Sequence, residues 1–439
     1  QSSPHIGHLR SALVYDLWRR WLNYRGFDVT LVRNVTDIDD KILSAASITS
    51  STEPWWALAY RYELEFTAGY KAIGIQPPTY EPRATASITE MQTIIAHLIE
   101  RGHAYSAPDA SGDVYFDTAS WPAYGELTRQ KPDDMVAASD ADPRAKRDAR
   151  DFALWKGHKD GEPADAAWPS PWGDGRPGWH IECSAMARRY LGAAFDIHGG
   201  GLDLRFPHHE NELAQSKAAG DGFASYWVHN GLVNVNGQKM SKSLGNSIFA
   251  AEFLELARPL VVRYFLGAAH YRSTIDYHNG ALVEAEAALE RIEVFLNRAD
   301  RRLTGTQFAA AEVVPVAFAS AMDDDLAVPA ALGVLHETVR AGNLAFDADD
   351  LTALASTRAE VLAMVEVLGI NPGSAQWAAA ASEPTERALG RLVEALIADR
   401  NNARAAKDFA TADRIRDELA AAGITIEDGA AESHWSVDS

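Results

Sequence analysis

Two histidines near the start of the chain are spaced to act on one ligand. They lie in Pro4-His5-Ile6-Gly7-His8, at the point where an amphipathic helix is predicted to begin. The amino end of a helix attracts phosphate because its N–H groups lack partners and its dipole is positive there. Gly7 lets a flat ring approach the backbone. These residues indicate a nucleotide-phosphate site, although two surface histidines at a helix start would show the same pattern.

A second motif supplies two lysines that suit the same substrate. Lys239-Met240-Ser241-Lys242-Ser243 follows a predicted hairpin, whose Asn236-Gly237 tolerates the positive φ of a tight turn. Two ammonium groups on flexible stems, with hydroxyls between them, can stabilise charge that develops on polyphosphate oxygens. A lone loop of this kind is more often solvated. Both motifs in this order, with a parallel-sheet pattern between them, favour an enzyme that activates its substrate with a nucleotide.

Three further side chains have the chemistry of metal ligands. Cys183 precedes a predicted helix on which His208 and Glu212 share one face at i, i+4. Thiolate, imidazole and carboxylate all bind Zn²⁺, and three protein ligands with an open position are typical of a catalytic site. A lone cysteine is more often a small buried hydrophobe, and His209 competes with His208 as the ligand. We expect the three to converge on one metal-sized site at the carboxyl edge of the sheet.

The elements that must position these residues alternate between helix and strand. The apolar pattern predicts a helix over 9–25, a buried strand within 27–37, helices at about 56–73 and 86–102, a helix over 181–191, a strand at 195–198, a helix over 208–219 and a strand at 226–230. This order predicts an α/β protein with a parallel sheet. After residue 250 the helical segments, at about 281–303, 325–343, 350–368, 384–403 and 407–422, predict a bundle.

The composition narrows the class of protein. The chain has 439 residues, enough for more than one domain, and no apolar run approaches the ~20 residues of a membrane span. Because Cys183 is the only cysteine, no intrachain disulfide exists, and we expect a cytoplasmic protein. The net charge of −20 argues against nonspecific coating of nucleic acid, but not against a specific RNA partner. The chain starts without Met, so we expect that N-terminal residues are missing.

The two nucleotide motifs resemble the HIGH and KMSKS signatures of class I aminoacyl-tRNA synthetases. NVTDIDDKI, GWHIECSAM and HGGGLDLRFPHHENE are similar to the cysteinyl branch of that family, and the resemblance covers nearly the whole chain. It implies that the enzyme activates L-cysteine with ATP to cysteinyl-adenylate, releasing pyrophosphate, and then transfers cysteine to the 3′ end of its tRNA. Mg²⁺ would accompany ATP, and we expect a monomer that does not bind membranes.

The resemblance also implies roles for individual residues. The catalytic residues would be His5, His8, Lys239 and Lys242. Contacts to ATP would come from His5, Gly7, His8, Lys242, and also His198 and Gly200, which end a predicted strand. Thr36, Trp179 and Asp203 would line the cysteine pocket, whereas Asp37, Asp39 and Asp40 are predicted to be structural, capping or solvated.

One Zn²⁺ per chain is implied by the same resemblance. Cys183, His208 and Glu212 match three of its ligands, and the fourth would be a cysteine upstream of the HIGH motif, in a segment that this chain does not include. Cysteine and serine differ by one atom, so shape alone separates them by only ~1–3 kcal/mol. A metal that bonds a thiolate strongly would separate them far better and would make an editing domain unnecessary.

The predicted domain order combines the patterns with the resemblance. We expect a Rossmann-type parallel-sheet catalytic core in residues 1–81 and 176–250, interrupted by a connective insertion at 82–175. A linker region that contacts the tRNA stem would follow at 251–290, then an α-helical bundle at 291–385 and a small C-terminal anticodon-binding region at 386–439. SAMDDDLAVPAAL and RNNARAAKDFATADRIRDEL carry the resemblance in the last two. RNA contacts there would come from Arg400, Arg404, Lys407, Arg414, Arg416 and Trp435.

Two other functions fit parts of the sequence. A paralogous ligase attaches cysteine to an amino sugar in mycothiol synthesis, but that family lacks the extended C-terminal region seen in 400–419. A noncatalytic RNA-binding protein derived from a synthetase should have decayed signature motifs, whereas both motifs are intact here. The sequence therefore favours the tRNA ligase.

Overall fold

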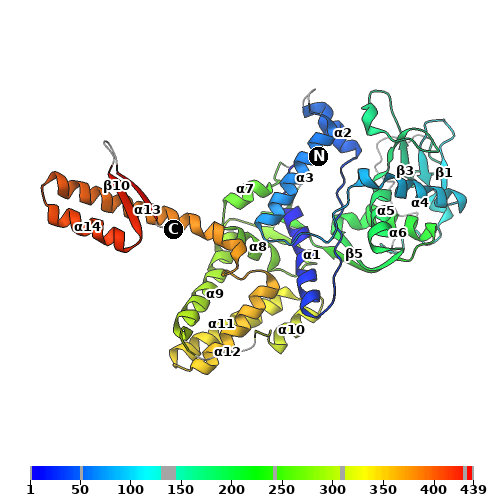
Figure 1. The fold of residues 1–439 in the computed structure, drawn as a ribbon. Coiled ribbons are helices and arrows are strands. Elements are labelled where there is room, and N and C mark those ends of the chain that lie inside the picture. Colours follow the sequence, from blue (N-terminus) through cyan, green and yellow to red (C-terminus); the bar gives the residue numbers. More distant parts are fainter. Residues whose placement is uncertain are drawn as a thin grey trace. The chain divides into compact units, whose positions relative to one another are not determined.

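The computed structural model describes residues 2–49, 53–129, 145–240, 245–306, 312–428 and 433–437. The chain forms two compact units, residues 1–371 and 372–439 (Figure 1). The first unit contains both nucleotide motifs and all the predicted metal ligands. Its elements therefore decide how the candidate site is built.

Helix α1 (Ile6–Tyr24) is the element on which the first unit is assembled. Its apolar residues recur at helical spacing, and Gly26, with φ of 89°, lets the chain turn away after its end. The buried residues on this stripe are Ile6, Leu9, Leu13, Val14, Leu17 and Trp21. The fully buried Arg10 on the same helix donates hydrogen bonds to the carbonyls of Leu266, His270 and Ser273. The predicted helix over 9–25 is thus present, and it is fastened to chain segments far away in sequence.

Two parallel strands form the part of the core that carries the candidate site. Strand β5 (Ala194–Gly201) pairs in parallel with β6 (Phe223–Asn230), and helix α6 (Glu210–Ala219) crosses between them. Helix α5 (Trp179–Leu191) leads into β5, and the short helices η5 (Leu202–Leu204) and η6 (Arg205–His209) lead into α6. The parallel β-α-β order predicted from the sequence is confirmed here.

A small second sheet follows β6. Strand β7 (Val233–Val235) pairs antiparallel with β8 (Gln238–Lys239) and parallel with β9 (Ile275–Tyr277). The turn between β7 and β8 has positive φ at Asn236 (50°) and Gly237 (76°). The predicted hairpin is therefore present, and it delivers the lysine motif from its second strand.

The strand predicted within residues 27–37 is wrong as a regular strand. Only isolated parallel bridges, Val32 to Tyr80 and Val35 to Arg83, join this segment to residues 79–84. Pro82 lies between the two bridged residues of the partner segment and has no backbone N–H to donate. A continuous ladder therefore cannot form, and the segment instead makes single hydrogen bonds such as Arg33 N–H to the Tyr80 carbonyl, 3.1 Å.

The insertion is an antiparallel sheet covered by helices. Its strands run in the order β1 (Ala104–Ser106), β2 (Val114–Phe116), β3 (Phe152–Gly157) and β4 (Gly175–Pro177). The chain reaches it through α2 (Asp40–Thr49), α3 (Trp55–Ala72), η1 (Ala84–Ser87) and α4 (Ile88–Glu100). Short turns η2 (Thr118–Ser120) and η4 (Ala164–Ala166) complete it. One apolar core, with Phe116, Phe152 and Trp155 at its centre, joins this sheet to α4, α5 and α6.

Beyond the lysine motif the first unit is helical. It contains α7 (Ala250–Glu255), α8 (Pro259–Gly267), α9 (Ala281–Leu303), α10 (Val316–Asp323), α11 (Val328–Asp347) and α12 (Leu351–Leu368). Figure 1 shows α9, α11 and α12 lying side by side, as expected for a bundle. Helix α10 was not predicted, because it is short and has no clear apolar stripe.

A buried ion pair joins α1, α8 and the end of α12. The Arg263 Nη2 atom lies 2.6 Å from Asp16 Oδ2, and both side chains are 1% exposed. Arg263 also donates to the carbonyls of Leu368, Ile73 and Gly74. Asp16 accepts a second charge-assisted bond from Arg20, 2.8 Å. The bundle is therefore tied through hydrogen bonds to the helix that begins with the histidine motif.

The second unit has its own small core. It consists of α13 (Ala375–Ala405), α14 (Phe409–Ala421) and the hairpin of β10 (Ile424–Asp428) and β11 (Ser433–Val437). Val393, Ile397, Ile415, Leu419 and Ile424 form the core, and Trp435 packs against it. Arg400, one of the residues predicted to contact RNA, is 6% exposed.

Candidate active site and metal centre

The two histidines of the first motif hold each other in one arrangement. His5 Nδ1 accepts the Gly7 N–H at 3.1 Å, and His8 Nδ1 accepts the His5 N–H at 3.1 Å. Their rings stack with centroids 3.7 Å apart. Because both Nδ1 atoms accept, each neutral ring carries its hydrogen on Nε2. A Cβ on Gly7 would lie 3.0 Å from the His5 ring, so a larger residue would push the two apart.

The lysine motif lies against the histidine motif. The methyl carbon of Met240 would lie 3.4 Å from a Cβ on Gly7. The chain after the lysines also pairs with the chain around His5: the Ile6 N–H donates to the Ile248 carbonyl, 3.1 Å, and the Ala250 N–H donates to the Pro4 carbonyl, 2.8 Å. These two backbone hydrogen bonds therefore bring the segment after the lysine motif beside the histidine motif. Lys239 is exposed at the end of β8. Lys242 lies outside the described residues.

The glycines that end β5 allow α1 to approach the sheet. The Tyr15 hydroxyl donates to the Gly200 carbonyl, 3.1 Å, and lies 2.9 Å from the Val228 carbonyl on β6. A Cβ on Gly199 would lie 2.5 Å from the Tyr15 oxygen and 2.4 Å from the Val228 oxygen, closer than non-bonded atoms approach. Burial raises the pKa of Tyr15 far above its usual range, so its hydroxyl remains a donor. Gly199 and Gly200 are thus placed beside the middle of α1.

The structure brings the three predicted metal ligands together. The ligand atoms of Cys183, His208 and Glu212 all lie within 4.8 Å of one another. His208 Nε2 is 2.8 Å from Glu212 Oε1, as the i, i+4 spacing predicts. Glu212 is completely buried, at the start of α6. Since His208 itself lies in η6 rather than in α6, the turn before the helix supplies one ligand and its first turn supplies another.

A second group of donors shares Glu212. His198, His209 and Glu212 also place their ligand atoms within 4.8 Å, and His198 Nε2 lies 3.1 Å from Glu212 Oε2. His209 Nδ1 is 2.8 Å from His229 Nε2. His229 was missed in the sequence because a histidine within a strand, as in YWVHN, gives no signal of its own. The first group differs from the second by its thiol, which is the softer ligand.

The histidine beside Cys183 on α5 was also missed. His180 Nδ1 is 3.0 Å from His208 Nδ1, and both rings are buried. Gln215 on α6 donates to the His180 carbonyl and to Ser184 Oγ, the latter at 2.7 Å. These contacts hold α5 and α6 together directly behind the ligands. The position of His180 within GWHIEC was the available signal, but it equally suited a core residue.

Burial sets the protonation of this site. It raises the pKa of the Cys183 thiol well above its usual range, helped by the charges of Glu212 and Glu182, even though the residue as a whole is only partly buried. It lowers the pKa of His209 to about 3 and that of His229 to about 4. Burial opposes ionisation of Glu212, but His198 and His208 more than offset it, so its pKa lies well below the usual value. Neutral imidazoles and an ionised carboxylate are the forms that bind a divalent metal.

The predicted cysteine-pocket residues are placed on three elements. Trp179 starts α5 and lies over His208, with centroids 4.1 Å apart, so it is next to the metal group. Thr36 accepts a hydrogen bond from Asn34, 3.4 Å. Asp203 is exposed in η5 and folds over Gly201, where a Cβ would lie 2.4 Å from its Oδ1. Of these three residues, Trp179 is the one that the described contacts place against a candidate metal ligand, His208.

Consecutive residues of the segment HHENE have different partners. His208 and Glu212 face Cys183, and His209 faces His229. Glu210 instead accepts hydrogen bonds from the N–H groups of Gly125 and Thr128, both at 2.9 Å. Asn211 is bonded to Tyr124. The turn that carries the candidate ligands is thus also the anchor of the insertion loop at 124–128.

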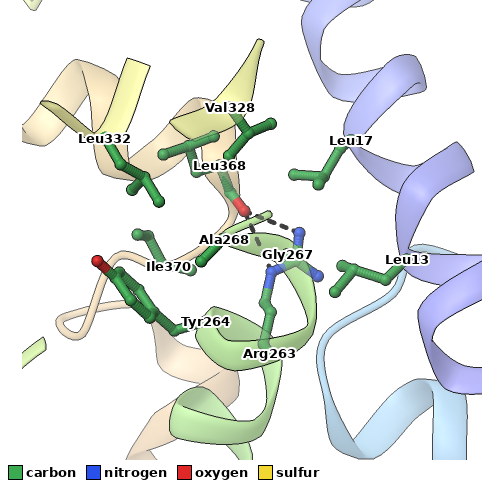
Figure 2. A pocket seen from close by; sticks show the side chains of 10 residues that line it. All are labelled: Leu13, Leu17, Arg263, Tyr264, Gly267, Ala268, Val328, Leu332, Leu368 and Ile370. Carbon is green, nitrogen blue, oxygen red and sulfur yellow. Dashed lines mark hydrogen bonds between the residues drawn. The ribbon is translucent and has the colours of Figure 1, made fainter. Parts of the chain in front are cut away.

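A small cavity lies away from this chemistry. It encloses about 20 Å³ between α1, α8 and the bundle, and the residues shown in Figure 2 line it: Leu13, Leu17, Arg263, Tyr264, Gly267, Ala268, Val328, Leu332, Leu368 and Ile370. None of the predicted site residues is among them. The cavity is a packing feature of the junction between core and bundle, with room for about one water molecule.

Comparison with known proteins places this fold and site. A family model for the "tRNA synthetases class I (C) catalytic domain" matches residues 1–287, and a "DALR domain" matches 317–371. The Mycobacterium tuberculosis methionyl-tRNA synthetase in complex with methionyl-adenylate has the same fold, with a TM-score of 0.58 at 17% identity, over 84% of this chain and 87% of that one. Fold and site therefore define a class I aminoacyl-tRNA synthetase.

The relatives narrow the class further. The cysteine–tRNA ligase of Leifsonia xyli subsp. xyli is 72% identical over 100% of this chain and 93% of its own length, and that of Clavibacter michiganensis subsp. michiganensis is 70% identical with the same coverage. A "Cysteinyl-tRNA ligase anticodon binding domain" matches residues 386–435. The chain belongs to the cysteine–tRNA ligase family. It is an ATP-dependent aminoacyl-tRNA ligase that forms cysteinyl-tRNA, and the mycothiol and noncatalytic alternatives are not favoured. Within the described residues, every helix is too short or too polar to span a bilayer.

Proposed function

We propose that cysteine is activated between the paired motifs and the donor group of Cys183, His208 and Glu212, and that this group holds one Zn²⁺. The observation that carries the proposal is the convergence of thiol, imidazole and carboxylate within 4.8 Å, beside Trp179. The donor set fits Zn²⁺ because it combines the soft and borderline ligands that this ion prefers. His198, 3.1 Å from Glu212, would then orient this carboxylate rather than bind the ion.

The nucleotide would be held by the two motifs. Because the Nε2 atoms of His5 and His8 carry the ring hydrogens, both histidines can donate to phosphate oxygens, and Gly7 keeps room beside them. Lys239 and Lys242 would stabilise the charge on the departing pyrophosphate, which leaves with Mg²⁺. His198 and Gly200 would contact the adenosine. The close packing of Met240 on Gly7 supports this arrangement, since it brings the lysine loop to the histidines.

The substrate cysteine would be held at both of its ends. Asp203 would pair with the α-ammonium group, Thr36 would accept a hydrogen bond near the same end, and Trp179 would cover the pocket. Zn²⁺, when bound, would supply a bond to the thiolate that a serine hydroxyl cannot match. The buried surroundings of Cys183 and Glu212 support the proposal, because a dry site strengthens both the charge interactions and the penalty for an unmatched ligand.

Replacing Cys183 by Ser tests the metal and the specificity together. We expect lower zinc content in the purified protein and a lower cysteine-to-serine ratio of kcat/KM in ATP–pyrophosphate exchange. His209→Asn is the matched control, because His209 belongs to the competing donor group and its loss should leave zinc content near the wild-type level. A Cys183→Ser protein that retains full zinc, or a metal-free protein that still rejects serine by several orders of magnitude, would contradict the proposal.

The remaining assignments rest on the family. We propose tRNA for cysteine as the macromolecular partner, bound in part by residues 386–439, and a cytoplasmic monomer. The domain division predicted from the sequence, with a catalytic core in 1–81 and 176–250, an insertion at 82–175, a stem-contact linker at 251–290 and a bundle at 291–385, is proposed on the same ground. Binding of the isolated tRNA to the full chain, measured with and without an anticodon substitution, tests the partner.

A further inference from the structure

Four charged side chains connect the loop that carries Thr36 with the strands that lead into α5. Asp40 Oδ2 lies 2.8 Å from Lys156 Nζ on β3, and Asp40 Oδ1 lies 2.7 Å from Arg176 Nη2 on β4. Arg176 also forms two bonds to Glu162, at 2.6 and 2.8 Å. The network therefore spans the substrate loop and the insertion sheet.

The position of Asp40 within this network is not interchangeable. Lys156 and Arg176 are direct partners in the β3–β4 register, so two positive charges lie opposite each other. Like charges in that arrangement repel unless an anion bridges them, and Asp40 accepts from both. Burial alone would raise the pKa of Asp40, but these two cations lower it to about 2. The bridging carboxylate is therefore ionised throughout the neutral range.

The other two acidic residues of NVTDIDD, Asp37 and Asp39, make different contacts from Asp40. Asp37 accepts the N–H of Thr85 at 2.9 Å, which ties the loop to η1. Asp39 accepts the N–H of Ile42 at 2.7 Å and so caps α2. The Asp37 bond joins the loop to η1, which packs against α5, whereas the Asp39 bond stays within its own segment. Asp40 is the one of the three that is paired with strands β3 and β4.

The strands on the far side of the bridge lead directly to the candidate site. Strand β4 contains Arg176 and runs into α5, which begins at Trp179 and carries Cys183. Strand β3, which carries Lys156, packs against α5. Asp40, four residues after Thr36 in the chain, is therefore paired with the two strands that adjoin the Trp179–Cys183 helix.

We propose that Asp40 is a positioning residue, which sets the separation between Thr36 and the Trp179–Cys183 face of α5 so that cysteine is gripped at its ammonium end and its sulfur end at once. The inference rests on the proposed function of Thr36. The nucleotide motifs share no contact with this network among the described residues. Loss of the bridge should therefore weaken recognition of cysteine and leave recognition of ATP unchanged.

The test compares Asp40→Ala, Thr36→Ala and the double variant in ATP–pyrophosphate exchange. We expect Asp40→Ala to raise the KM for cysteine by about tenfold, with the KM for ATP within about twofold of wild type. In the Thr36→Ala background, Asp40→Ala should add little, because it acts through Thr36. Glu90→Ala is the control. Glu90 on α4 pairs with Arg189 on α5, with Oε1 and Nη1 2.6 Å apart, on a partly exposed side away from the loop. Its loss should therefore change neither the KM for cysteine nor the KM for ATP.

The outcomes separate the two proposals. Thr36→Ala without effect on the KM for cysteine would refute the assignment of Thr36 and, with it, the role of Asp40. An effect of Thr36→Ala with none of Asp40→Ala, or full additivity in the double variant, would overturn the inference about Asp40 and leave the proposed function standing. Arg176 keeps Glu162 when Asp40 is lost, so the variant should fold. Asp40→Asn, which removes only the charge, repeats the test if thermal unfolding shows otherwise.

Discussion

The buried ion pair between Asp16 and Arg263 provides a stability prediction that can be worked from the contacts. Arg263→Met removes the guanidinium from a site with 1% exposure and leaves the carbonyls of Ile73, Gly74 and Leu368 without this donor. Asp16 keeps Arg20 and the Gln76 N–H. Loss of one member of a buried pair costs about 3–5 kcal/mol. For a unit of this size, that corresponds to a fall in melting temperature of about 5–10 °C.

The same pair predicts how the loss depends on pH. Burial alone would raise the pKa of Asp16, but Arg263 and Arg20 outweigh it, so the pKa lies below the usual value. A carboxylate with a lowered pKa stabilises the folded state fully above its unfolded pKa of ~3.9, and that contribution is lost as pH falls through the folded value. The difference between wild type and Arg263→Met should therefore be largest near neutral pH and narrow below about pH 4.

Thermal unfolding followed by tryptophan fluorescence, from about pH 7 to 3, measures both effects. Arg258→Met is the control, since Arg258 immediately precedes the same helix but its partners Glu286 and Glu293 are partly exposed. Its loss should cost less than about 1 kcal/mol. A melting temperature of Arg263→Met within about 1 °C of wild type, or a difference between the two proteins that widens as the pH falls, would refute the stabilising role of the buried pair.

Alanine substitutions at two glycines should have different effects: one should stabilise the protein, and the other should lower its activity. A Cβ on Gly267 would meet Leu13 and Leu17 at 3.5 and 3.6 Å across the cavity in Figure 2. Gly267→Ala should therefore stabilise the protein by about 0.5–1 kcal/mol, measured by urea unfolding. Any destabilisation would show that the cavity is closed in solution. Gly199→Ala should lower the kcat/KM for ATP by roughly 100-fold, because its Cβ would displace the Tyr15 hydroxyl from β5 and β6. Gly333→Ala, whose Cβ would have no heavy atom within 4 Å, should leave that constant unchanged, and equal effects at both positions would refute the clash.

Periodicity in the sequence was sufficient where one face of an element is buried against one partner. Helix α1 and the i, i+4 pair of His208 and Glu212 have that property, and both are present as predicted. The strand predicted at 27–37 is wrong because strand propensity describes the segment alone. A ladder also needs N–H donors on the partner segment, and Pro82 interrupts them there.

Residues that act through tertiary contacts were the ones that the sequence could not reveal. His180 contacts His208 from α5, and His229 contacts His209 from β6; packing rather than sequence spacing brings these elements together. Asp40 was predicted to be structural, and its reach across to β3 and β4 depends on a sheet whose register no local pattern encodes. In the C-terminal unit, Arg400 is 6% exposed, a burial that the basic pattern of the sequence does not reveal.

The pairing of residues 4–6 with residues 248–250 has a consequence for the protein while it is being made. The Ile6 N–H finds the Ile248 carbonyl only after some 240 intervening residues have been added, and Arg10 waits longer still for the carbonyls of His270 and Ser273. At roughly 5–20 residues per second, the ribosome needs about 12–50 s to supply them. During that interval α1 has its contacts with α3 and residues 74–77, but it lacks the partners that follow residue 247, so part of its apolar stripe stays available to chaperones or to other nascent chains. The pairing of the two motifs is therefore among the last contacts of the catalytic half to form.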